Sequence, residues 1–111
     1  MNDEEVREEW LLFRDDVSAR AIASKQSEWA LLELFARYRK LSEQERRSVD
    51  GLLVEQVDSD DKNVRFDAFA VIREFRIVSA LKALRALAER LERDSSTGAP
   101  EEWSMVNRLI G

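Results

Sequence analysis

Residues 58–69 contain the pattern in this chain that comes nearest to a metal site. The segment reads DSDDKNVRFDAF, and Asp58 and Asp60 occupy the first and third positions of a calcium-binding loop. The fifth position is then Lys62, and the twelfth is Phe69, where such a loop needs a bidentate glutamate. The mismatch favours a solvated loop that caps a helix, and we expect no metal ion and no other cofactor.

Two further patterns could belong to an enzyme. Ser79 and Lys82 fit S-x-x-K, the nucleophile motif of penicillin-binding enzymes, but the companion S-D-N and K-T-G motifs are absent from the sequence. A buried acid beside an arginine could bind a small ligand or serve acid–base chemistry, and Asp67 and Glu74 are candidates for that acid. We predict that the protein is not an enzyme and keep the acid–arginine site as an alternative.

The negative charge of the chain is concentrated at its start. The net charge is −5, and residues 1–16 hold seven acids against two bases, whereas residues 17–111 hold 16 of each. Glu4 and Glu8, like Glu5 and Glu9, are one helical turn apart, and a solvated acidic face explains these pairs better than a catalytic cleft. The acidic balance also disfavours nucleic acid as a partner.

Composition excludes several other classes of protein. The sequence has no cysteine and no histidine, which excludes disulfides and zinc sites with nitrogen or sulfur ligands. No apolar run approaches the roughly 18 residues that suggest a membrane span. The N-terminus, MNDEEVREEW, is acidic where a secretory signal would be basic and then apolar. These features predict a cytoplasmic protein with no membrane partner, folded as one domain over residues 1–111.

Apolar spacing and capping residues predict an all-α chain of five to six helices. The expected helices span residues 3–23, 27–40, 42–57, 62–75, 80–93 and 100–110. Ser42 and Glu45 fit a reciprocal capping box, Asn2 or Asp3 can cap the first helix, and one of the acids at 58–61 can cap the fourth. We also expect Ser27 and Ser79 to cap the second and fifth helices. Adjacent helices with such short joints lie roughly antiparallel.

Each expected helix carries an apolar stripe. In the first helix Val6, Trp10, Phe13 and Val17 follow 4-3-4 spacing. Four residues are expected to widen that stripe: Leu11, Leu12, Ala21 and Ile22. Among the three tryptophans, Trp103 is the best candidate for a binding anchor because its helix is short and terminal.

Residues 58–93 resemble a HEAT repeat. Asp60, Val64 with Arg65, Ala68, and two Ala-Leu pairs at 80–81 and 83–84 are similar to the short HEAT-like repeats named after phycobiliprotein lyases. The resemblance implies a short right-handed stack of helical hairpins, in which Asp60 or Asp61 pairs with Arg65. It does not imply lyase activity, for which the sequence shows no motif.

The combined features predict a non-enzymatic protein–protein interaction module. One specific form is a small acidic inhibitor or immunity-type protein that binds a basic partner, steered by its first helix. A nucleic-acid-binding HEAT-like domain is a further alternative, and the chain is expected to be a monomer or a homodimer. The predicted partner-binding residues are Glu4, Glu5, Glu8, Glu9, Asp60, Asp61, Arg65 and Trp103.

Overall fold

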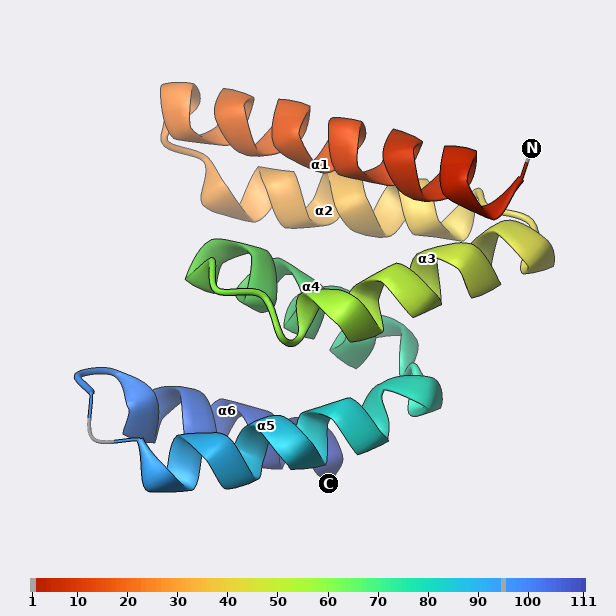
Figure 1. Ribbon diagram of the computed structural model, residues 1–111. Helices are drawn as coiled ribbons and strands as arrows, with labels where there is room; N and C mark the ends of the chain where they lie inside the picture. The colour runs from red at the N-terminus through yellow and green to blue at the C-terminus, as the bar shows by residue number, and fades with distance from the viewer. Residues whose placement is uncertain (1, 95) are drawn as a thin grey trace. The chain divides into compact units, whose positions relative to one another are not determined.

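The computed structural model describes residues 2–94 and 96–111, and every element of regular secondary structure in that part of the chain is a helix (Figure 1). The prediction of an all-α protein is therefore confirmed. Helix bounds agree with the sequence expectation to within a few residues. The elements are α1 (Asp3–Ser24), α2 (Ser27–Arg39), α3 (Glu43–Gln56), α4 (Lys62–Phe75), the 3₁₀ turn η1 (Val78–Ala80), α5 (Leu81–Arg93) and α6 (Ala99–Ile110).

The chain divides into two compact units, Met1–Leu52 and Leu53–Gly111, with the boundary inside α3. The expectations of one domain and of a right-handed HEAT-like stack both stay predictions.

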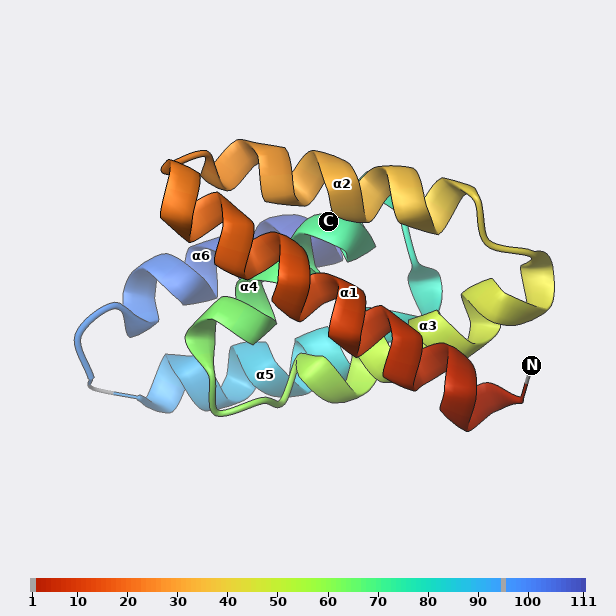
Figure 2. The same cartoon turned by 90° about the horizontal axis from the view of Figure 1, so that it is seen from above.

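In the first unit α1 and α2 form an antiparallel pair (Figure 2). The rings of Trp10 and Tyr38 meet edge to face with centroids 6.4 Å apart, an arrangement that aromatic pairs favour. Tyr38 Oη also donates a hydrogen bond of 2.8 Å to Asp50 of α3. Of the stripe predicted for the first helix, Val6, Trp10 and Val17 are buried and Phe13 is half-buried.

The predicted widening of that stripe was wrong for Leu11, Leu12 and Ile22. These side chains are exposed, Leu12 to 63% and Ile22 to 76%. The reason is angular: Leu12 follows Trp10 by two residues and therefore lies about 200° further round the helix axis. Arg14, four residues after Trp10, occupies the buried stripe instead.

The predicted caps of three helices are confirmed. Asn2 Oδ1 accepts from the backbone N–H of Glu5, and Asp61 Oδ1 accepts from that of Asn63. Ser42 and Glu45 cap each other reciprocally, with N···O distances of 2.8 and 3.2 Å. The N–H of Ser42 lowers the pKa of the Glu45 carboxyl because it stabilises the charged form.

Two capping predictions were wrong. Ser27 is the first residue of α2, and Gln26 occupies the N-cap position. Ser79 lies inside η1, so that α5 begins at Leu81 without a side-chain cap. The cause is the end of α4, where Arg76 takes a left-handed conformation (φ 50°) and redirects the chain before Ser79 is reached.

In the second unit α6 packs against both α5 and α4. Gly98, at φ 92°, permits the turn into α6, and Pro100 stands in the first turn, where its missing N–H costs nothing. The side chains of Leu84 and Val106 are fully buried. The resemblance to a HEAT repeat would instead pair α4 with α5, and this arrangement stays a prediction.

We expect Gly51→Ala to stabilise the protein. Gly51 lies inside α3, where alanine is favoured by about 1 kcal/mol. The added methyl group would lie 2.6 Å from Nη2 of Arg7, the flexible end of a side chain whose pairing with Asp3 is solvent-accessible and weak. Urea denaturation should show a gain of about 0.5–1 kcal/mol.

Gly98→Ala is the matched control and should have the opposite sign. Its positive φ disfavours any side chain, so the same measurement should show destabilisation. A loss of stability on Gly51→Ala would mean that Arg7 cannot move aside.

Candidate functional site

The acid–arginine pair of this protein joins Arg65 of α4 to Glu102 of α6. Arg65 Nε donates to Glu102 Oε2 at 2.8 Å, and Arg65 Nη2 donates to Glu102 Oε1 at 2.7 Å. Glu102 is only 3% exposed. Parallel bonds of this kind are the strongest form of arginine–carboxylate pairing, and they stabilise the carboxylate that burial would otherwise disfavour.

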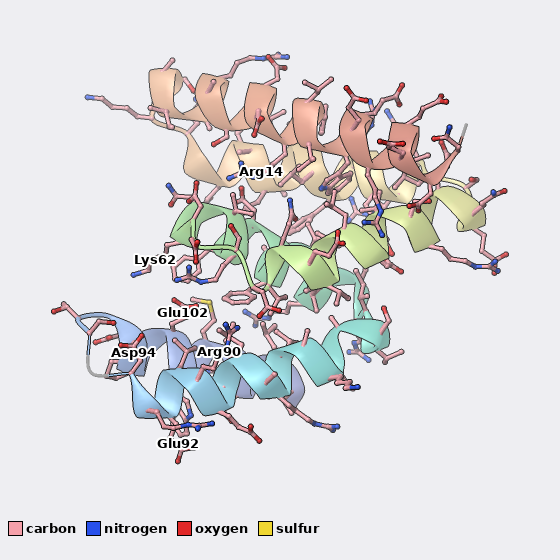
Figure 3. All side chains as sticks on the ribbon, in the orientation of Figure 1. Arg14, Lys62, Arg90, Glu92, Asp94 and Glu102 are labelled. Carbon is pink, nitrogen blue, oxygen red and sulfur yellow. The ribbon has the colours of Figure 1, made fainter. Side chains whose placement is uncertain are left out.

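Arg65 also holds the loop that precedes its own helix. Its Nη1 donates to the backbone oxygens of Ser59 at 3.0 Å and Asp60 at 3.3 Å. The hydrogen bond to Glu102 raises the pKa of the Arg65 guanidinium, and burial opposes that rise only in part. All three guanidinium nitrogens donate to the protein, so the pair ties the loop and α4 to α6. Glu102 is labelled in Figure 3.

The partner that the resemblance implied for Arg65 is therefore incorrect. Asp61 caps α4 with its side chain, and Asp60 contributes its backbone oxygen. Geometry explains this: the N-cap position commits the Asp61 carboxylate to the helix N-terminus. Sequence reasoning missed Glu102, although Ala99, Glu102 and Val106 follow 3-4 spacing and form one buried row. That spacing was the available signal.

Neither of the acids proposed for a ligand or catalytic site is fully buried. Glu74 is exposed and Asp67 is half-buried. Among residues 2–94 and 96–111, no group of three or more acidic side chains is placed to hold a metal ion. Within the same residues, no helix is both long and apolar enough to cross a membrane.

Four predicted partner-binding residues lie together on α1. We define the acidic face as the exposed acids of α1 between positions 4 and 16 together with Leu12, which lies among them. Its members are Glu4, Glu5, Glu8, Glu9, Leu12, Asp15 and Asp16. Three of the acids contact arginines: Glu9 with Arg37 at 3.7 Å, Asp15 with Arg14 at 3.1 Å, and Asp16 with Arg20.

The other four predicted residues belong to the second unit. Asp60 and Asp61 are exposed in the loop before α4, and Arg65 is largely committed to Glu102. Trp103 of α6 is 38% exposed. The predicted set thus divides into an acidic helix in one unit and a loop with a neighbouring tryptophan in the other.

Comparison with known proteins adds no relative to these observations. The sequence matches no protein-family model, and the searches of curated proteins and of solved structures found no match.

Proposed function

We propose that this protein is a non-enzymatic protein-binding module whose acidic face binds a basic partner. The observation that carries the proposal is the placement of Leu12. Its side chain is 63% exposed, and Glu8, Glu9, Asp15 and Asp16 are its neighbours one turn before and after on the helix surface. An apolar side chain ringed by carboxylates fits an apolar site that is rimmed by cations.

The charge distribution supports the same proposal. The first 16 residues carry a net charge of −5, which equals the net charge of the whole chain. A localised field of this kind steers a cationic partner and raises its association rate by about 10–10³-fold at low salt. Leu12 would then supply apolar burial once the complex has formed.

In a narrower form of the proposal, the partner is a basic enzyme that the protein inhibits, in the manner of an immunity protein. A helical-hairpin stack of the HEAT type, with the right-handed arrangement that the resemblance implies, would present the acidic face as part of an extended binding surface. The acid–arginine alternative has less support, because the Arg65 guanidinium is engaged by Glu102 and the backbone.

Charge reversal on the acidic face tests the proposal. We expect Glu5→Lys with Glu8→Lys to abolish capture of the partner from a lysate of the native cell, read out by quantitative mass spectrometry. The control, Glu89→Lys with Glu92→Lys, makes the same change of charge on two exposed residues of α5 and should leave capture unchanged.

The captured partner provides the quantitative measurement. Its association rate should fall at least about tenfold in the α1 variant and should fall for the wild-type protein as salt is added. Equal loss of binding in both variants, or a captured partner that is itself acidic, would refute the proposal.

A further inference from the structure

The second unit contains a groove between α4 and α6 that the proposed function does not use. The groove has two adjoining hollows of about 370 and about 350 Å³. Phe66 and Phe69 of α4 and Met105 of α6 line the first hollow. Arg73 of α4 and Arg108 of α6 line both. We call this surface the α4–α6 groove.

Helical spacing explains how this lining arises. On α4, residues 66, 69 and 73 succeed one another at intervals of three and four, and on α6 residues 101, 105 and 108 do the same. Each helix therefore presents one row of side chains to the groove. Arg73 and Arg108 both stand in the last turn of their helices.

The two arginines are not neutralised by the protein. Within the part of the chain that the structure describes, no carboxylate forms an ion pair with Arg73 or Arg108, in contrast to Arg65 and Arg90 of the same unit. Glu101 also lines the first hollow but precedes Arg108 by seven residues, about 10 Å along α6. The groove therefore joins an apolar lining to guanidinium groups that have hydrogen-bond donors available.

We propose that the α4–α6 groove binds a small amphiphilic carboxylate. The carboxylate accepts hydrogen bonds from Arg73 and Arg108, and the apolar chain lies over Phe66, Phe69 and Met105. Arginine matches a carboxylate in both charge and geometry, and burial of the chain removes apolar surface from water. This site is separate from the acidic face and does not depend on the proposed function.

The size of the groove favours a small molecule over a peptide helix. A hollow of about 370 Å³ lies in the range of roughly 300–1,000 Å³ that is common for small-molecule pockets, which pair an apolar lining with a few polar groups. A helix with its side chains is about 10–12 Å across and would not enter a hollow of this volume. The sign of the two unpaired charges selects an anion over a cation.

Titration with decanoate, below its micelle concentration, tests the site in the full chain. Isothermal calorimetry should show binding of decanoate by the wild-type protein and no binding of decyltrimethylammonium, which has the same chain and the opposite charge. Arg73→Gln with Arg108→Gln should weaken decanoate binding at least about tenfold, the loss expected for charge-assisted hydrogen bonds. The control Arg85→Gln with Arg93→Gln removes two exposed arginines of α5 and should bind as wild type.

A second variant tests the apolar part without altering charge. Ala70 lines the first hollow, so Ala70→Phe should fill the space and abolish binding of decanoate. Circular dichroism checks that each variant is folded. If a variant does not fold, the comparison of decanoate with decyltrimethylammonium on the wild-type protein still tests the proposal.

The following results would overturn the proposal. They are equal binding of the cationic amphiphile, an equal loss of affinity in the α5 control, and absence of decanoate binding by a folded wild-type protein. Binding of an acidic helical peptide but not of decanoate would overturn it as well.

Discussion

Replacing Glu102 with alanine is expected to lower the free energy of unfolding by about 3 kcal/mol. The substitution leaves the largely buried Arg65 guanidinium without its carboxylate, since the backbone oxygens of Ser59 and Asp60 satisfy only Nη1. It also releases the tie between α4 and α6. Urea denaturation, followed by circular dichroism, measures the loss.

Two further variants separate the ion pair from its surroundings. Glu101→Ala removes the neighbouring exposed acid of the same helix turn and should change stability by less than about 0.5 kcal/mol. Replacing both partners, Arg65→Met with Glu102→Leu, should recover most of the stability, because apolar side chains of similar size need no pairing. If Glu102→Ala were as mild as Glu101→Ala, the buried ion pair could not be what holds α6 to the loop.

Leu84→Ala is expected to have a comparable effect through a different cause. Leu84 lies on α5, and its exposed fraction is 0%. Truncation removes three buried carbon atoms and leaves a cavity, and buried leucines replaced in this way cost about 2–5 kcal/mol. The thermal midpoint and the urea midpoint should both fall.

The matched control is Leu12→Ala, the same substitution at a leucine that is 63% exposed. Its effect on stability should be close to zero, within about 0.5 kcal/mol, because little apolar area returns to water. Under the proposed function it should nevertheless weaken partner binding. A large loss of stability from Leu12→Ala would show that this side chain is covered in solution.

Local features of the chain were predictable because their causes lie within a few residues. Ser42 and Glu45 cap each other across three residues, and Asp61 caps α4 two residues away. Helix spans follow from the same short-range spacing. The acidic face likewise needs only the position of the acids on one helix.

The angular position of a stripe was predicted less well. Leu11 and Leu12 adjoin Val6, Trp10 and Val17 in sequence, yet both leucines are exposed, whereas the other three residues are buried. The burial of Arg14 was not predicted, because its side chain is charged. A long side chain can place its stem on the apolar stripe while its guanidinium reaches a polar atom.

The amino-acid sequence by itself determined the helical class, the ends of most helices and the concentration of acid on α1, because these depend on residues within one or two turns of each other. Only the tertiary structure decided that Arg65 meets Glu102, 37 positions away, and not the aspartates beside it. The same holds for Arg73 and Arg108, which share a groove although 35 positions separate them. Helix packing brings such distant side chains together. Where it buries a charged group, as it does for Glu102, that group needs a partner of opposite charge.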